Sequence, residues 1–268
     1  MTLGMGPAIL FCPADRPERF RKAAERADAV ILDLEDAVAS AARPAAREAL
    51  VAHSLDPART IVRINPPGTP DFVADIAALS RTGYRTVMVA KAENASEFEA
   101  LDGYQVIALC ETAKGVLAAE SIARHHSVVA LMWGAEDLAA SLGGTSSRHP
   151  DGSYRDVARH ARSRVLLAAR AHGKAAIDSV FLDIKNTTAL TAEVTDAAAS
   201  GFNATACIHP SQVDTIRAAY LPSDADVRTA QAIIAAAADQ PGVFTFEGRM
   251  VDEPVIRHAA ETLRRAGR

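Results

Sequence analysis

The feature that most constrains the fold of this chain is a regular alternation of short apolar runs with longer, Ala-rich stretches of helical period. Each run is rich in β-branched and aliphatic residues and is too short for a helix, as expected of strands covered on both faces. The eight runs span residues 8–13, 29–34, 60–65, 86–90, 105–110, 128–133, 179–184 and 204–208. Eight strand–helix alternations favour an α/β fold of the (β/α)8, or TIM-barrel, type over an open doubly wound sheet.

The stretches between these runs place apolar residues at helical spacing. The candidate helices span residues 16–26, 43–53, 71–81, 96–101, 115–125, 156–172 and 192–200. Beyond the eighth run lie a helix at 224–239, an apolar segment at 243–251 and a closing helix at 253–266. We expect one domain over residues 1–268, with a barrel at about 8–215 and a short helical extension at about 216–268 that packs on the barrel or reaches a neighbouring subunit.

The longest interval between expected strands separates the sixth from the seventh. It contains a polar loop at residues 143–154, with the sequence GGTSSRHPDGSY. A long loop at this end of a barrel suits either a lid over the site or a plain surface excursion, and both remain open.

The charge balance excludes several kinds of partner. The chain has 29 Lys and Arg residues against 33 Asp and Glu, a net charge of −4, and so no basic footprint for nucleic acid or an anionic membrane. No apolar window approaches the ~18 residues of a membrane helix, and the N-terminus lacks the basic region of a signal peptide. The separated Cys12, Cys110 and Cys207 suit buried, reduced thiols. We expect a soluble, cytoplasmic protein.

Charged residues recur at the C-terminal ends of the expected strands, where barrels of this type build their active sites. The polar residues at these ends are Asp33, Glu35, Asp36, Arg63, Asn65, Lys91, Glu93, Glu111, Glu136, Asp137, Asp183, Lys185 and His209. Carboxylates gathered around one mouth repel one another unless cations hold them. Arg63 and Lys91 supply two positive charges, and a divalent metal ion would supply the rest.

Glu111 and Asp137 follow the fifth and sixth strands, which are neighbours in the expected barrel. Carboxylates without a Cys–His cluster favour Mg²⁺ or Mn²⁺ over zinc, and Mg²⁺ typically takes one or two carboxylates plus water and substrate oxygens. The alternative is that these carboxylates only cap the helices that follow. His209 also has two interpretations, a histidine bonded to the backbone or a substrate contact. The chain contains no dinucleotide fingerprint, Walker sequence or serine-nucleophile elbow.

Seven segments, in order along the chain, resemble one known family. They are LFCPADRPERFRKA from Leu10, ILDLEDAV from Ile31, VRIN from Val62, ETAKGV from Glu111, WGAEDL from Trp133, CIHPSQV from Cys207 and GRMVDEP from Gly248. Together they resemble the citrate lyase beta-subunit-like branch of the HpcH/HpaI aldolase superfamily, over nearly the whole chain. The resemblance implies a TIM barrel assembled into trimers or hexamers. It also implies a Mg²⁺-dependent acyl-CoA lyase that cleaves or forms a carbon–carbon bond between acetyl-CoA and a keto acid.

The same resemblance implies roles for residues at the barrel mouth. Glu111 and Asp137 match the magnesium ligands of the family. Arg63 matches the arginine that holds the carboxylate or keto group of the substrate. Glu136, together with Asp137, resembles the pair whose backbone meets the oxo acid. These four residues therefore form the expected metal and substrate site.

The resemblance places coenzyme A and a neighbouring subunit around this site. Phe11, Arg16 and Lys22 match positions that contact coenzyme A, and the two cations suit its phosphates. His209, in the CIHPSQV segment, joins them as a candidate contact. Asp252 resembles the acidic residue that a neighbouring subunit donates in related lyases and synthases.

The chemistry of such a lyase suits the residues present. A β-hydroxyacyl thioester cleaves when its hydroxyl loses a proton and the bond to the α-carbon breaks, which leaves a thioester enolate. Magnesium acts as a Lewis acid, and Arg63 stabilises the developing oxygen charge. Asp252 or Glu35 would protonate the enolate carbon, and Asp36 is a further catalytic candidate beside Glu35.

Three alternatives remain open beside this lead. A free 2-keto-acid or pyruvate aldolase would need no coenzyme A contacts, so Phe11, Arg16 and Lys22 count against it. A non-autonomous component of a citrate lyase complex would work only beside acyl-carrier and transferase subunits. A non-catalytic binding protein fits least, because the expected metal and arginine set is complete. The sequence is compatible with malyl, citramalyl, citryl and 3-hydroxy-3-methylglutaryl thioesters as the substrate.

Overall fold

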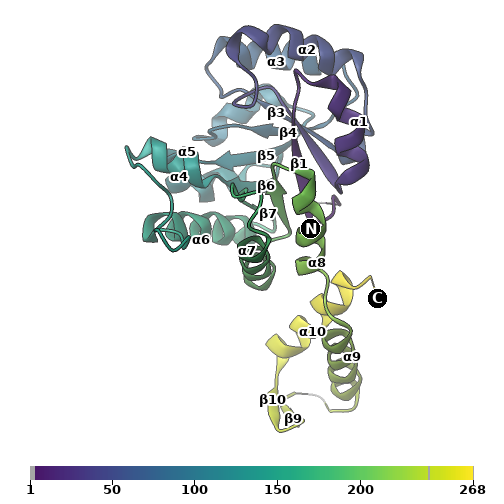
Figure 1. Ribbon diagram of the computed structural model, residues 1–268. Helices are drawn as coiled ribbons and strands as arrows, with labels where there is room; N and C mark the ends of the chain where they lie inside the picture. The colour runs from purple at the N-terminus through teal and green to yellow at the C-terminus, as the bar shows by residue number, and fades with distance from the viewer. Residues whose placement is uncertain (1–3, 241, 268) are drawn as a thin grey trace. The chain divides into compact units, whose positions relative to one another are not determined.

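The computed structural model describes residues 4–240 and 242–267, and it divides into two compact units that meet in sequence between Ile216 and Arg217. In the first unit, eight parallel strands form a closed barrel in the order β1 to β8 (Figure 1). Helices follow the strands and cover the outside of the barrel. The expected (β/α)8 fold is confirmed.

The strands lie close to the apolar runs, with one exception. They are β1 (Ala8–Pro13), β2 (Ala29–Asp33), β3 (Thr60–Ile64), β4 (Thr86–Val89), β5 (Gln105–Cys110), β6 (Val128–Trp133), β7 (Ala175–Asp178) and β8 (Ala204–Cys207). Alternate residues of each strand point into the barrel, where they form one apolar cluster that includes Ile31, Ile61, Ile107 and Leu109. Side chains two positions further along the same strands point the same way and reach the C-terminal end of the barrel interior.

The seventh expected strand, at residues 179–184, is wrong. The strand is Ala175–Asp178, and the run SVFLDI that follows it is a loop in which Leu182 and Ile184 are exposed. Strand register here is set by pairing with neighbours, since Ala175 to Ile177 pair with β6 and Ile177 to Asp178 pair with β8. Two alanines make a weak strand signal, whereas the β-branched and aromatic residues downstream make a strong one. Asp178, not Asp183, therefore ends this strand.

The helices of the first unit begin at recognisable signals, as at Thr112, whose side chain caps α4 by accepting from the backbone N–H of Gly115. These helices are α1 (Pro17–Arg26), α2 (Arg43–Ala52), α3 (Pro70–Leu79), α4 (Ala113–Arg124), α5 (Ala135–Ser141), α6 (Asp156–Ala171) and α7 (Thr187–Ser200). Helix α8 (Val213–Tyr220) contains the sequence boundary between the two units. The expected helix at 96–101 is a 3-10 segment, Ala95–Leu101. The short helices α5 and α8 had not been expected.

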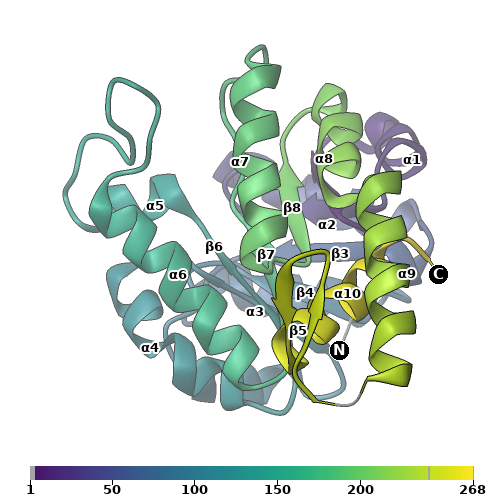
Figure 2. The same cartoon turned by 90° about the horizontal axis from the view of Figure 1, so that it is seen from below.

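The second unit consists of two helices joined by a hairpin (Figure 2). Helix α9 (Asp224–Asp239) leads to the strands β9 (Phe244–Phe246) and β10 (Arg249–Val251), and α10 (Glu253–Arg265) closes the chain. The two-residue turn of the hairpin is Glu247-Gly248, and both residues have positive φ, as type I′ turns require. Phe244 and Val251, one on each strand of the hairpin, are buried.

Among the described residues, no helix combines the length and the apolar character needed to cross a membrane. Cys12, Cys110 and Cys207 are all buried, as expected.

Candidate active site

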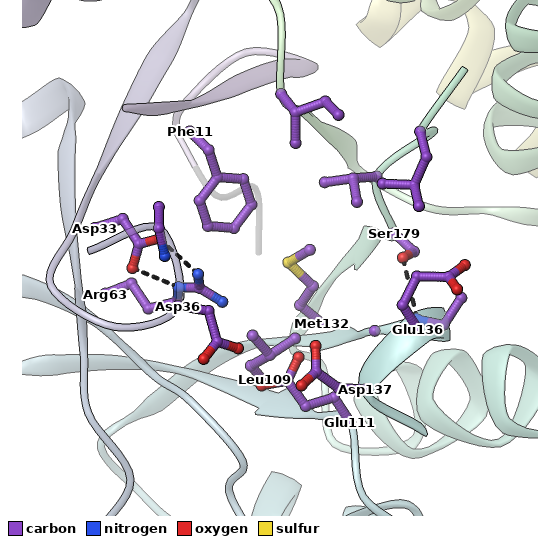
Figure 3. A pocket seen from close by; sticks show the side chains of 16 residues that line it. Phe11, Asp33, Asp36, Arg63, Leu109, Glu111, Met132, Glu136, Asp137 and Ser179 are labelled. Carbon is purple, nitrogen blue, oxygen red and sulfur yellow. Dashed lines mark hydrogen bonds and ion pairs between the residues drawn. The ribbon is translucent and has the colours of Figure 1, made fainter. Parts of the chain in front are cut away.

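A pocket opens at the C-terminal ends of the barrel strands (Figure 3). Its lining comes from seven strand ends and consists of Phe11, Asp33, Asp36, Ala37, Arg63, Leu109, Glu111, Met132, Gly134, Ala135, Glu136, Asp137, Ser179, Val180, Leu182 and Ile208. The cavity measures about 230 Å³, which is below the usual range for drug-sized ligands. A small keto acid suits this space, whereas a nucleotide does not.

Strand alternation explains why charged side chains reach the pocket. On β2, β3 and β5 the inward-pointing Ile31, Ile61 and Leu109 are each followed two residues later by a charged residue. Those residues are Asp33, Arg63 and Glu111. The apolar layer below and the polar layer above are therefore produced by one pattern.

Arg63 is held rigidly at one side of the pocket. Its Nε and Nη2 donate to the two carboxylate oxygens of Asp33 at 2.7 and 2.5 Å, and its Nη1 lies 3.1 Å from Glu35 Oε2. The guanidinium also lies over the Phe11 ring, 4.9 Å from the centroid. Burial lowers the pKa of Arg63, but Asp33 and Glu35 outweigh it and raise the pKa above its ordinary value. Arg63 thus stays charged and preorganised.

Glu35 and Asp36 follow β2 and share the ammonium group of Lys91. Lys91 Nζ donates to Glu35 Oε1 at 2.5 Å and to Asp36 Oδ2 at 3.0 Å. Burial raises the pKa of Glu35, against the opposing charges of Arg63 and Lys91. Burial also raises the pKa of Asp36, but the hydrogen bond and charge of Lys91 prevail and lower it overall. Asp36 lines the pocket, whereas Glu35 is buried and is not part of the lining.

Glu111 and Asp137 form a carboxylate pair at one side of the pocket (Figure 3). Glu111 is 2% exposed, and burial followed by the nearby charge of Asp137 raises its pKa to about 8. Gly134 makes room for this side chain, because a Cβ at position 134 would lie 2.6 Å from Glu111 Oε2. The backbone N–H of Lys91 donates to Glu111 Oε1 at 3.1 Å. Glu111 is buried and is repelled by the neighbouring carboxylate of Asp137. This part of the pocket therefore lacks positive charge.

A magnesium ion fits this pair. The donors are oxygens only, and among residues 4–240 and 242–267 no three His, Cys, Asp or Glu side chains gather as a metal-binding group. An ion that fills most of its octahedron with water and substrate oxygens needs only the two carboxylates. A structural zinc site, with four protein ligands, does not match. The repulsion between Glu111 and Asp137 is what a divalent cation would relieve.

Glu136, next to Asp137 in the first turn of α5, has a different environment. Its Oε1 accepts from Ser147 Oγ at 2.6 Å, which ties it to the loop between α5 and α6. That loop, which is visible between α5 and α6 in Figure 2, is itself anchored to α7. Arg148 of the loop donates to both carboxylate oxygens of Glu193 in α7, at 2.8 and 3.0 Å. Arg148 also stacks on Tyr154 at 3.7 Å. The loop at 143–154 is therefore fastened to α7.

The residues expected to contact coenzyme A occupy three places. Phe11 lies in the pocket wall, while Arg16 and Lys22 are exposed at the start and on the outer face of α1. His209 follows β8, and its Nδ1 accepts from the backbone N–H of Ser211 at 3.2 Å. His209 therefore has the backbone contact that the structural interpretation requires, and its ring is exposed.

Asp252 belongs to the second unit and caps α10. Its Oδ1 accepts from the backbone N–H of Val255 at 3.3 Å. Asp252 is therefore the N-cap residue of this helix.

The sequence pattern missed Asp178, the buried residue that ends β7. It accepts from Trp133 Nε1 at 2.6 Å, and Arg162 forks onto it with bonds of 3.0 and 2.8 Å. Asp178 points outward to α6, while its neighbour Ser179 lines the pocket. The signal was present: β2 and β7 end alike, in AVILD and AAID. Asp183 and Lys185, expected at this strand end, are exposed in the following loop.

The barrel and its carboxylate–arginine mouth define the protein as a (β/α)8-barrel enzyme of the aldolase and lyase class. The chain belongs to the HpcH/HpaI aldolase/citrate lyase family, whose model matches residues 8–210. That span begins at β1 and extends past β8. The resemblance of the seven segments is therefore confirmed at the level of the family.

Named relatives cover nearly the whole chain. A citrate lyase subunit beta-like protein of Mycobacterium tuberculosis is 56% identical over 262 residues, 98% of this chain and 96% of its own. A (3S)-malyl-CoA thioesterase of Cereibacter sphaeroides is 33% identical, over 97% of this chain and 94% of its own. The crystal structure of protein CitE from M. tuberculosis in complex with magnesium, acetoacetate and coenzyme A superimposes with a TM-score of 0.96 at 56% identity, covering 99% of this chain and all of that one.

A second structure from the same organism is the citrate lyase beta subunit complexed with oxaloacetate and magnesium. It has a TM-score of 0.81 at 58% identity and covers 83% of this chain and all of that one. Both relatives therefore carry magnesium with a small oxo acid.

Proposed function

We propose that this protein is a Mg²⁺-dependent carbon–carbon lyase that cleaves, or in reverse forms, a short β-hydroxyacyl-CoA thioester, giving acetyl-CoA and a keto acid. The observation that carries the proposal is the position of Glu111, Asp137 and Arg63 in one small pocket. The complexes of the relatives with magnesium, keto acids and coenzyme A support the same cofactor and ligand classes.

Glu111 and Asp137 would hold the magnesium ion, and Mn²⁺ suits the same ligands. When bound, the ion would act as a Lewis acid toward oxygens of the substrate. Arg63 would bind the carboxylate or keto oxygen through the edge of its guanidinium that faces the pocket, and would stabilise negative charge developing there. The backbone at Glu136 and Asp137, in the first turn of α5, would meet the oxo acid from the other side.

Proton transfer falls to the remaining carboxyl groups. The hydroxyl proton passes to a carboxylate, the bond between the carbinol carbon and the α-carbon breaks, and the electron pair forms the thioester enolate. Asp36 lines the pocket and Glu35 adjoins it, so these two are the candidates on this chain. Asp252, contributed by a neighbouring subunit, is the further candidate that would protonate the enolate carbon.

Coenzyme A would lie outside the small pocket, because about 230 Å³ accommodates only the acyl portion. Phe11 would contact the thioester end. Arg16 and Lys22 would bind phosphate groups along the exposed face of α1, where cations are accessible to a dinucleotide-sized ligand. His209, exposed after β8, completes the proposed contacts. We propose a homotrimer or hexamer in the cytoplasm as the working form, since Asp252 would act on a partner's site.

Product analysis tests the proposal. The purified protein is incubated with Mg²⁺ and with malyl-, citramalyl-, citryl- and 3-hydroxy-3-methylglutaryl-CoA in turn, and acetyl-CoA is measured by chromatography. We expect release from at least one thioester, and none from the Glu111→Gln, Asp137→Asn double variant.

Two outcomes would replace this proposal by its alternatives. Cleavage of free hydroxy keto acids without any thioester turnover would indicate an aldolase. Activity that appears only after acyl-carrier and transferase subunits are added would indicate a component of a citrate lyase complex.

A further inference from the structure

Lys91 is the cation at the centre of the acidic mouth. It follows β4, and its ammonium nitrogen lies near four carboxylates that come from three other parts of the barrel. The distances are 2.5 Å to Glu35, 3.0 Å to Asp36, 3.3 Å to Asp137 and 3.9 Å to Glu111. The two shorter contacts anchor the side chain beside β2. The two longer ones reach the proposed metal ligands.

The backbone of Lys91 is unusual as well. Its φ is 51°, in the left-handed region that residues other than glycine and asparagine rarely adopt. In this conformation its N–H donates to Glu111 Oε1 at 3.1 Å. The disfavoured backbone conformation of Lys91 thus coincides with a backbone hydrogen bond to one of the proposed metal ligands.

The charge balance of the mouth defines what the ammonium group does. Five carboxylates, Asp33, Glu35, Asp36, Glu111 and Asp137, face the two cations Arg63 and Lys91, which leaves a formal charge of −3. Arg63 is occupied by Asp33 and Glu35. The charge of Arg63 also acts on Glu111, but among the described residues Lys91 is the cation that forms ion pairs with both Glu111 and Asp137. A divalent ion at that pair would lie within a few ångströms of the ammonium group and would be repelled by it.

We propose that Lys91 is a positioning residue that sets the metal affinity of the site: its ammonium group holds Glu111 and Asp137 together in the metal-free protein and, by like-charge repulsion, weakens the binding of a divalent ion to that pair. The inference rests on the proposed function only in taking Glu111 and Asp137 as the metal ligands. Its consequence is that the protein alone binds the ion weakly, and that the oxygens of a bound keto acid are needed to complete a tight site.

Replacement of the side chain separates the two effects of Lys91. In Lys91→Met the charge disappears, but the backbone N–H that fixes Glu111 remains. Glu111 also stays confined against Gly134, and Asp137 stays in the first turn of α5. These contacts keep the two carboxylates within reach of one bound ion, although they are less tightly paired than with the ammonium group, and the repulsion of that ion is removed. Metal binding should tighten rather than weaken.

The experiment is a titration of the full-length protein with Mn²⁺ in the absence of any substrate, with free Mn²⁺ followed by electron paramagnetic resonance. We expect the Mn²⁺ dissociation constant to fall at least fivefold in Lys91→Met and to change less than twofold in Lys91→Arg, which keeps the charge. Lys114→Met is the matched control, because Lys114 pairs with Glu93 at 3.1 Å and forms no ion pair with either proposed ligand. Its affinity should equal that of the wild type.

Thermal melting gives a second readout that does not depend on turnover. Lys91→Met should melt below the wild type without metal and should gain more than the wild type from added Mg²⁺. If Lys91→Met does not fold, Lys91→Gln replaces it, since its amide can still donate to Glu35. An affinity that is unchanged or weaker in a folded neutral variant overturns the inference and leaves Lys91 as charge balance alone.

The metal assignment itself fails in a different way. If wild-type protein binds no Mn²⁺ even with a keto acid present, or if the Glu111→Gln, Asp137→Asn double variant binds it as well as the wild type does, the proposed ligands are wrong. Normal wild-type binding with an unaltered Lys91→Met variant would contradict only the role of Lys91.

Discussion

Arg63 shows what a single residue contributes to this site and what chemistry can replace it. A planar guanidinium forks onto Asp33 and reaches Glu35 with its remaining nitrogen. The single ammonium group of a lysine cannot form the paired bonds to Asp33 and also reach Glu35. The specific function of Arg63 is therefore geometric as much as electrostatic.

We expect Arg63→Lys to lose at least ~2 kcal/mol of transition-state stabilisation, on the scale of charged hydrogen bonds. The measurement is kcat/KM for the thioester that the wild type cleaves best, with circular dichroism as the check on folding. Catalytic efficiency close to that of the wild type would show that Arg63 only balances charge.

Gly134 is required by its neighbour rather than by its own backbone. A Cβ there would lie 2.6 Å from Glu111 Oε2 and 2.9 Å from Glu111 Cβ, so Glu111 itself would have to move. We expect Gly134→Ala to lose Mn²⁺ binding and activity, and to unfold with a free energy lower by about 1–3 kcal/mol, as overpacked sites do. Gly83→Ala is the control, because its nearest contact would be an ordinary 3.6 Å. Equal metal affinity in the two variants would contradict this account.

Residue types at the mouth could be predicted from the sequence, but their pairing could not. The strand-end pattern identified Arg63, Lys91, Glu111 and Asp137 as neighbours, because parallel strands of a barrel end on the same face. Which cation takes which carboxylate depends on side-chain reach and on burial. The sharing of Lys91 by carboxylates that follow β2, β5 and β6 joins parts of the chain that no local pattern connects.

At the scale of elements, β7 is the strand whose position in the structure differs from the position predicted from the sequence. Seven strands could be located because each is an apolar run of the right length between helices. For β7, the strongest apolar run follows the strand and lines the pocket through Val180 and Leu182. Pairing with β6 and β8 overrides intrinsic strand preference, as is common in central strands. The helices α5 and α8 were missed because seven or eight residues give too few turns for a period.

Asp178 tests the register of β7. It is buried and accepts bonds from Trp133 and Arg162, so Asp178→Asn would leave a largely buried guanidinium with only the exposed Asp196 as its carboxylate partner. We expect a loss of about 3 kcal/mol in the free energy of unfolding, as for other broken buried pairs. Asp183→Asn, in the exposed loop, should be neutral within about 0.5 kcal/mol. Urea unfolding measures both, and the reverse order of effects would restore the strand at 179–184.

At the scale of the whole molecule, the second unit raises the question of shared sites. Asp252 caps α10, and asparagine caps a helix about as well as aspartate. Asp252→Asn therefore keeps the helix and removes the carboxyl group. A loss of turnover in this variant would come from chemistry and not from unfolding of α10.

Mixing two inactive variants tests action between subunits. Arg63→Ala and Asp252→Asn proteins are unfolded together and refolded as mixed oligomers. If Asp252 serves a partner's site, some interfaces combine an intact Arg63 with an intact Asp252, and a fraction of the activity returns, up to about one quarter of the sites for random pairing at a two-chain site. A mixture as inactive as its components, or full activity in Asp252→Asn alone, would remove Asp252 from this role.

The pocket wall also has a consequence for how such an enzyme can diversify. Its charged residues lie at the strand ends or in the first turn of α5, and most of them are tied to one another by ion pairs, whereas Val180 and Leu182 belong to the loop after β7 and form no part of those ion pairs. Changes in that loop can alter the shape offered to the acyl group while the ionic framework stays intact. Selection, in nature or in the laboratory, can therefore exchange one hydroxyacyl substrate for another through a few apolar substitutions without rebuilding the catalytic apparatus.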